Sequence, residues 1–192
     1  PEIGTKVAML KTGELDLANV PGEQLPDLKS AGLATEANPV GGLILNVSWG
    51  GLLVPEDKRY NPDVHNKDPW VDSRVRKAMA ISIDRAAIAK AIYAGYADPA
   101  GVPMLTKGVE KYQYAYDPAG AKQLLKDAGY PDGFTFKAMS YIYPSAPETP
   151  RLMEALCGYW QQIGLTPKIT NIDYAAYVSK NKVTGKTAGE AC

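Results

Sequence analysis

The sequence predicts a mixed α/β fold. Short apolar runs that suit strands alternate with longer segments in which apolar residues recur every three or four positions, as they do in amphipathic helices. The chain has 192 residues, of which 45% are hydrophobic and 22% are charged, so it can bury a core and has the composition of a globular protein. We find no internal repeat and no low-complexity tract that would point to another fold class.

The part before residue 49 is predicted to hold two short helices and three extended segments. One helix ends at Gly13, since glycine readily adopts the left-handed conformation found at helix C-termini, and the other covers residues 23–31. The extended segments, which show alternating or continuous apolar residues, are residues 15–18, 33–38 and 42–48.

Residues 49–71 interrupt this regular pattern. They contain two glycines and three prolines, and their apolar residues follow no sustained period. A connection of this length inside a compact domain is uncommon, and it is usually a functional loop or a linker. We therefore place the boundary here, between a first unit of residues 1–48 and a second unit of residues 49–192.

Three helices are expected next, each with an aspartate at its start. Asp72, Asp84 and Asp117 are each placed to accept a hydrogen bond from the first turn of a helix, and Asp117 is followed by a proline, which suits the first helical position. The second of these helices is expected to end at Gly95 and the third at Gly129.

Strands and helices then alternate. We expect a strand from Phe134 to about Tyr141, a helix over residues 148–163, a strand over residues 165–172, and a helix that begins at Asp173. Pro167 lacks a backbone N–H, which favours either an edge position for the second strand or a place at its start. The expected inward face of the helix at 148–163 consists of Leu152, Ala155, Leu156, Tyr159 and Ile163.

Charge and composition exclude several functions. Lys and Arg total 21, as do Asp and Glu, and no basic block is present, so the chain is a poor candidate for nucleic-acid binding. No run of apolar residues is long enough to span a membrane. Two cysteines are too few for a disulfide scaffold or a four-cysteine zinc site.

The sequence also lacks the motifs of common catalytic and cofactor sites. It has neither a complete phosphate-binding loop nor a nucleophile elbow, and its single histidine, His65, is expected to be a solvated loop residue. Cys157 is expected to be a small buried hydrophobic residue. A disulfide between Cys157 and Cys192 is possible, and the sequence does not decide whether it forms. We therefore expect no enzyme activity, no metal site and no cofactor.

Tyrosine is unusually frequent, at 12 residues against 2 phenylalanines. Its apolar ring with a polar tip suits a half-solvated surface better than a dry core. The excess therefore predicts either a cleft for a polar ligand or a loop-rich packing with tyrosines at the edge of the core.

Several separated motifs resemble, in order and spacing, those of the family 5 extracellular solute-binding proteins. These are the peptide-, nickel- and oligopeptide-binding components of ABC transporters. The matching motifs are KTGELD at 11–16, DPWVDSRVRKA at 68–78, IDR at 83–85, IYAG at 92–95, YDP at 116–118 and AGYP at 128–131.

This resemblance implies a two-lobed, periplasmic-binding-protein-like fold that closes around a ligand at a hinge. Residues 1–48 would then belong to the larger lobe and its hinge strands, and residues 49–192 to a C-terminally incomplete second, smaller lobe. The protein would capture an extracellular or periplasmic solute, most simply a peptide, and deliver it to a membrane permease. We expect a monomer in the periplasm or at the cell surface on a lipid anchor. The alternative is a ligand-sensing or protein-docking module on the same fold.

The resemblance also points to two groups of ligand-binding residues. Asn46, Ser48 and Trp49 would lie where the chain leaves the hinge, although Trp49 could equally pack the hinge itself. The second group is Tyr141, Tyr143 and Glu148, at the end of a strand and the start of the next helix. Glu148 could pair with a ligand amine or act as an acidic residue that favours the helix N-terminus. Asp72, Arg74 and Arg76, within the best-matched motif, are expected to be structural.

Overall fold

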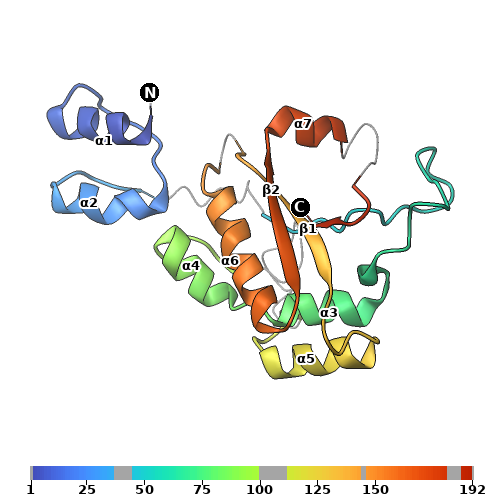
Figure 1. Ribbon diagram of the computed structural model, residues 1–192. Helices are drawn as coiled ribbons and strands as arrows, with labels where there is room; N and C mark the ends of the chain where they lie inside the picture. The colour runs from blue at the N-terminus through green and yellow to red at the C-terminus, as the bar shows by residue number, and fades with distance from the viewer. Residues whose placement is uncertain (1, 37–44, 100–111, 144–145, 181–186, 192) are drawn as a thin grey trace. The chain divides into compact units, whose positions relative to one another are not determined.

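The computed structural model describes residues 2–36, 45–99, 112–143, 146–180 and 187–191, and it has the mixed α/β fold that the sequence predicts (Figure 1). The chain forms two compact units. One consists of Pro1–Leu43 and Arg85–Pro99, and the other of Ile44–Asp84 and Ala100–Cys192. The assignment of residues 1–48 and 49–192 to two lobes stays a prediction.

The first unit is helical. Lys11 and Asp27 form an ion pair at 2.8 Å that joins its first two α-helices. Gly13 has a φ of 76° and ends the first helix, as expected. The elements of this unit are α1 (Ile3–Thr12), the 3-10 helix η1 (Gly22–Gln24), α2 (Leu25–Ser30) and α4 (Arg85–Tyr93).

The strand expected at residues 15–18 is not formed, and Leu17 is 88% exposed. Residues 33–36 and 45–48 also lie outside any ladder, while residues 37–44 lie outside the described part of the chain. Alternating apolar residues are insufficient for a strand, because a strand also needs a partner for its backbone groups.

The second unit is built on a three-stranded parallel sheet. Its strands are β1 (Thr135–Tyr141), β2 (Thr166–Ile172) and β3 (Glu190–Ala191), in the order β2-β1-β3. The first two confirm the expected strands, whereas β3 was not anticipated. Because the strands are parallel, their carboxyl ends lie at one edge of the sheet.

Pro167 lies on edge strand β2, as predicted. The N–H of Thr166 donates to the carbonyl of Phe134, the residue before β1, at 2.9 Å. Since successive residues of a parallel strand direct their backbone groups to opposite sides, the nitrogen of Pro167 faces away from β1. The proline therefore removes no hydrogen bond from the ladder.

Helix α6 (Thr149–Gln162) covers one face of the sheet. Its Trp160 ring contacts Phe136 of β1, with ring centroids 5.5 Å apart. The helix buries Met153, Leu156, Cys157 and Trp160. This stripe is rotated from the predicted one: Leu156 is buried as expected, whereas Leu152 and Tyr159 are only half-buried.

Helices α3 (Ser73–Ile81) and α5 (Pro118–Asp127) pack together at the other end of the unit, next to the 3-10 helix η2 (Pro69–Val71). Their predicted caps are confirmed. Asp72 accepts a hydrogen bond from the N–H of Arg74, and Asp117 accepts one from the N–H of Gly120, each at 2.8 Å.

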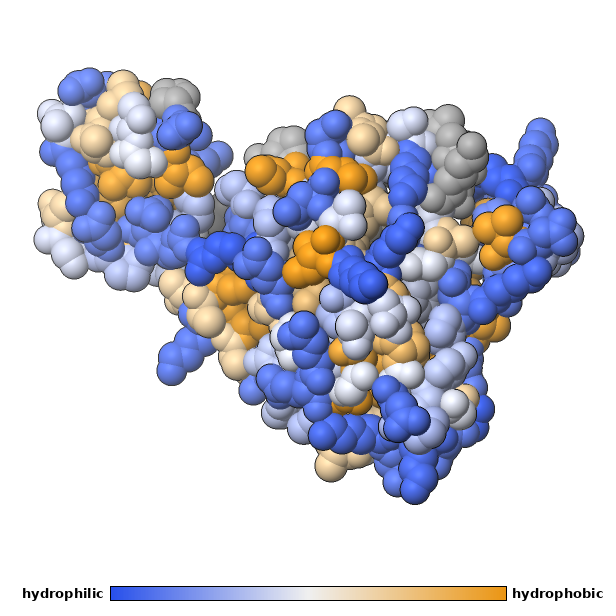
Figure 2. Space-filling model, viewed as in Figure 1, coloured by the Kyte–Doolittle hydropathy of each residue, from blue (hydrophilic) through white to orange (hydrophobic). Residues whose placement is uncertain are grey.

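The surface is mixed in character. Hydrophilic residues cover most of the face in Figure 2, and hydrophobic residues show as separate patches. Within the described residues, no helix has the length and apolar character needed to cross a membrane.

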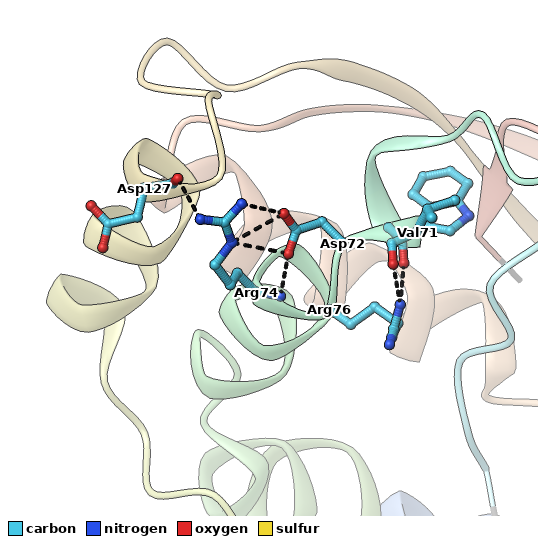
Figure 3. A network of polar contacts seen from close by, with 6 residues as sticks. Val71, Asp72, Arg74, Arg76 and Asp127 are labelled. Carbon is cyan, nitrogen blue, oxygen red and sulfur yellow. Dashed lines mark hydrogen bonds and ion pairs between the residues drawn. The ribbon is translucent and has the colours of Figure 1, made fainter.

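Asp72, Arg74 and Arg76 hold the start of α3 in place (Figure 3). Arg74 forms an ion pair with Asp72 at 2.6 Å and donates from Nη1 to the carbonyl oxygen of Asp127, at the end of α5, at 2.7 Å. Arg76 Nη1 donates to the carbonyl oxygens of Trp70 and Val71 at 2.6 and 2.9 Å. These contacts are within the protein, as expected for structural residues.

The Asp72 contacts predict a small acid dependence of stability. Hydrogen bonds from the Arg74 side chain and backbone lower the pKa of the Asp72 carboxyl below its usual value. A lowered pKa in the folded state means that the stabilisation is complete above the pKa of the unfolded chain, near 4, and is lost as the pH falls further. We expect Asp72→Asn to lower the urea midpoint of unfolding at pH 7 and pH 5. At pH 3 the difference in midpoint between wild type and variant should be smaller. A difference in midpoint that is the same at pH 3 as at pH 7 would contradict this role of the Asp72 carboxylate.

Candidate functional site

The carboxyl edge of the sheet carries a cluster of four tyrosines. Tyr141 ends β1, Tyr143 follows it, and Tyr174 and Tyr177 belong to α7 (Tyr174–Val178), the helix that comes directly after β2 (Figure 1). Tyr141 stacks on Tyr177 with ring centroids 4.1 Å apart, and Tyr143 meets Tyr174 edge-on at 5.2 Å. We call these four residues the tyrosine wall.

Local sequence explains why α7 presents two tyrosines to the sheet. The Asp173 side chain accepts a hydrogen bond from the N–H of Ala176 at 2.7 Å and so caps the helix, as expected. Tyr174 and Tyr177 are three residues apart and therefore share one helix face. Tyr177 is buried against Met139 of β1, and Tyr141 and Tyr174 pack around them.

Hydrogen bonds join the start of α6 to the end of β1. Thr149 Oγ1 donates to the carbonyl oxygen of Tyr141 at 2.7 Å and accepts from the N–H of Tyr143 at 3.1 Å. Glu148, the residue before Thr149, is consequently held beside the carboxyl end of β1. The structure thus brings together three predicted site residues, Tyr141, Tyr143 and Glu148.

Two polar side chains at this edge have buried atoms that lack partners. Glu148 occupies the N-cap position of α6, yet its side chain makes no capping hydrogen bond. Its Oε2 is shielded from solvent and has no hydrogen-bond partner among the described residues, and the same holds for Oγ of Ser140, a side chain that is 3% exposed. Buried polar atoms are normally hydrogen-bonded, so these two oxygens are candidates to accept hydrogen bonds from a ligand.

The other predicted site residues form a separate group. Trp49 pairs with Ala191 of β3, and its ring lies 5.8 Å from Trp70 and 6.2 Å from Trp160. Asn46 is exposed, and its Nδ2 donates to Oγ of Ser48 at 3.5 Å. Trp49 therefore packs against the aromatic core while staying partly exposed, and a ligand-stacking role for it stays a prediction.

Ser140, Tyr174 and Tyr177 were not among the predicted site residues. A signal for the tyrosines was present in the sequence. If residues 134–141 and 165–172 form parallel neighbouring strands, the residues that follow each strand meet at one edge. Tyr174 and Tyr177 follow the second strand at helical spacing and so belong beside Tyr141 and Tyr143.

Two reactive side chains outside this cluster, His65 and Cys157, are buried. His65 is 6% exposed, so the expectation of a solvated histidine is wrong: its Nδ1 accepts a hydrogen bond from the N–H of Asn61 at 2.8 Å, and its ring stacks on Tyr60. Cys157 is a buried free thiol, as expected, whose pKa burial raises to about 11, so it is protonated at neutral pH.

Across the part of the chain that the structure describes, no group of three or more His, Cys, Asp or Glu side chains could hold a metal ion. The other half of the possible disulfide, Cys192, lies outside those residues.

Comparison with known families shows which family the chain belongs to. The model for the middle part of the bacterial extracellular solute-binding proteins, family 5, matches residues 1–188. The chain belongs to this family. The resemblance in the motifs at 11–16 and 68–131 is thereby confirmed.

Curated relatives of the family 5 chain are binding proteins. The glutathione-binding protein GsiB of Salmonella choleraesuis is 34% identical over 174 residues, which cover 88% of this chain and 31% of GsiB. Heme-binding protein A of Haemophilus influenzae is 30% identical over 195 aligned positions, which cover 98% of this chain and 33% of the relative. The chain thus spans about a third of the length of these relatives.

Solved structures confirm the family 5 fold. HbpA2 from Haemophilus parasuis superposes with a TM-score of 0.63 at 24% identity, covering 100% of this chain and 36% of that protein. NikA from Brucella suis, in complex with Fe(III)-EDTA, superposes with a TM-score of 0.70 at 15% identity, covering 100% of this chain and 39% of that protein. At these identities the structures show a shared fold, and they leave the ligand open.

Proposed function

We propose that this chain supplies part of the ligand-binding surface of an ABC importer's solute-binding component, and that its ligand is a peptide. Family membership supports the binding role, since GsiB and heme-binding protein A are both named as binding proteins. Structures of similar fold include a protein in complex with the peptide STSA and a dipeptide-binding protein in complex with Met-Leu.

The observation that carries this proposal is the Glu148 carboxylate beside the tyrosine wall, one oxygen of which is shielded from solvent. Its Oε2 has no hydrogen-bond partner among the described residues, so an ammonium group from a ligand would supply the missing donor and the opposite charge. A peptide presents such a group at its N-terminus, together with backbone amides that suit polar edges and side chains that suit tyrosine rings. Asn46, Ser48 and Trp49 would contribute a second set of contacts.

The same proposal covers how the protein would close on its ligand, where it would act and in which oligomeric state. The ligand-bound form would close at a hinge, exclude water and present the peptide to a membrane permease. The protein would act as a monomer in the periplasm or at the cell surface, without nucleic acid. These expectations rest on the family, whose model is described as extracellular and solute-binding.

Thermal stabilisation tests the ligand class. The natural protein that contains this chain is mixed with the dipeptide Met-Leu, the tetrapeptide Ser-Thr-Ser-Ala, glutathione and heme. We expect the peptides to raise the melting temperature, since a ligand at a hundred times its dissociation constant adds about 2.7 kcal/mol of stability. Stabilisation by heme alone would contradict a peptide ligand. Stabilisation by none of the four would favour the sensing or docking alternative.

Glu148→Gln tests the site. The substitution keeps the size of the side chain and removes its charge, and a hydrogen bond between charged groups contributes about 1.5–3 kcal/mol. We expect calorimetry to show binding of the stabilising peptide weakened by about 10- to 100-fold.

Two controls make the Glu148→Gln result specific. Glu154→Gln, at an exposed position on the same helix, should leave the affinity unchanged. The N-acetylated form of the peptide should bind wild type and Glu148→Gln almost equally, because it lacks the ammonium group. An equal loss for the free and acetylated peptides would show that Glu148 does not bind the peptide amine.

A further inference from the structure

Helix α7 spans the width of the sheet. It begins after β2, where Asp173 caps it, and Tyr177 then packs on Met139 of the central strand β1. Lys180, two residues beyond the helix, donates a hydrogen bond from Nζ to Oε1 of Glu190 in β3. Neighbouring strands are about 4.8 Å apart, so β2 and β3 are separated by about 10 Å. The five residues of α7 advance about 7.5 Å, and the Lys180 side chain reaches the rest of the way to Glu190.

The ion pair between Lys180 and Glu190 connects the C-terminal end of α7 to β3. Glu190 pairs in register with Lys137, which places its side chain on the face of the sheet that Met139 and α7 share. The Glu190 residue is 7% exposed, and its Oε2 is shielded from solvent and has no hydrogen-bond partner among the described residues. Removing the lysine would therefore leave a buried carboxylate without its compensating charge.

The position of α7 determines the tyrosine wall. Tyr174 contributes the ring that meets both Tyr141 and Tyr143, with centroid distances of 5.6 and 5.2 Å. A helix of five residues is too short to be stable alone, so its place depends on its contacts with the rest of the unit, which are the packing of Tyr177 on Met139 and the bonds at its two ends. Asp173 holds the end at β2, and Lys180 holds the end at β3.

We propose that Lys180 and Glu190 are positioning residues, which fix α7 across the sheet and thereby set the tyrosine wall for ligand binding. Neither residue needs to touch the ligand. The effect on affinity rests on the proposed function, whereas the effect on α7 does not.

Hydrogen exchange measured by mass spectrometry tests the structural half. In the natural protein that contains this chain, Lys180→Met should make the amides of residues 174–178 exchange at least about tenfold faster, because the helix opens more often. Lys168→Met, at an exposed position on β2, is the matched control and should leave this exchange unchanged. Unchanged exchange in folded Lys180→Met would overturn the proposal.

Calorimetry with the stabilising peptide tests the functional half. We expect Lys180→Met and Glu190→Gln each to weaken binding by about 5- to 30-fold, and the double variant to be no weaker than the worse single variant, since one pair is lost in all three. Lys180→Arg should restore most of the affinity that Lys180→Met loses. If the double variant loses affinity by the product of the two single losses, Lys180 and Glu190 act independently, and the proposal is overturned.

Failure of the proposal and failure of the proposed function are distinguishable. If wild type binds no peptide, the proposed function fails, and amide exchange still decides whether the pair holds α7. If Glu190→Gln does not fold, Lys180→Met and Lys180→Arg carry the test, since Lys180 is more exposed than Glu190, with 37% of its side-chain surface accessible against 9%.

Discussion

Trp160→Ala is expected to lower the free energy of unfolding by about 4 kcal/mol, in the range seen when a buried tryptophan is truncated. Trp160 is fully buried, and its ring contacts Phe136 at 5.5 Å and Trp49 at 6.2 Å. Its indole N–H donates to the carbonyl oxygen of Met79 at 3.1 Å, which joins α6 to α3. The substitution thus removes packing and one of the two side-chain hydrogen bonds that the Met79 carbonyl accepts, the other coming from Ser82 Oγ at 3.0 Å. Equilibrium unfolding in urea at pH 7 measures the loss.

Two variants separate the contributions of Trp160. Trp160→Phe keeps much of the ring and loses the N–H, so its cost should reflect the hydrogen bond and be about 1–2 kcal/mol. Trp49→Ala truncates a tryptophan that is partly exposed, so it should cost clearly less than Trp160→Ala. Equal costs for Trp49→Ala and Trp160→Ala would show that the core is not centred on Trp160.

Helix α6 shows what the sequence could and could not reveal. Its existence, length and end at Gly164 follow from periodicity and glycine, but the buried face does not. The helix carries two overlapping apolar stripes, one with Leu152 and Tyr159 and the other with Met153 and Trp160. Choosing between them requires the position of the sheet, because a stripe is buried only where a partner surface exists.

Of the predicted strands, those that formed are the ones whose partner follows from the sequence. Residues 134–141 and 165–172 are separated by one helix, so they form a parallel pair by the common strand–helix–strand connection. The two residues of β3 show no apolar alternation, and their pairing depends on the docking of residues 187–191. There the N–H of Gly50 donates to the carbonyl oxygen of Glu190 at 2.8 Å. Long-range contacts of this kind leave no local pattern.

The candidate site was predicted in part for the same reason. Tyr141, Tyr143 and Glu148 were indicated by the family resemblance, and they lie together because they follow the same strand. Glu190 and Lys180 meet only after α7 has crossed the sheet, and an ion pair between a loop and a two-residue strand has no signature in the sequence. His65 likewise is buried by hydrogen bonds and ring stacking within its own loop, which composition does not reveal.

The register of β1 and β2, which brings both carboxyl ends to one edge, begins at a close backbone approach. A Cβ atom on Gly133 would lie 2.0 Å from the carbonyl oxygen of Gly164. Directly after these glycines, the N–H of Thr166 donates to the carbonyl oxygen of Phe134 and starts the ladder. The two loops can approach this closely because position 133 has no side chain, so a glycine far from the tyrosine wall decides where the wall forms.

Gly133→Ala should therefore be strongly destabilising. Gly133 has a φ of 71°, where an L-residue costs about 1–2 kcal/mol, and the clash with a backbone atom adds about 1–3 kcal/mol. Gly129→Ala is the matched control, because Gly129 has a φ of 93° and a Cβ there would meet nothing within 4 Å. Urea unfolding should give a loss of about 1–2 kcal/mol for Gly129→Ala and about 3–4 kcal/mol for Gly133→Ala. If both variants lose the same amount, backbone conformation alone accounts for the cost, and the contact between the two loops does not set the register.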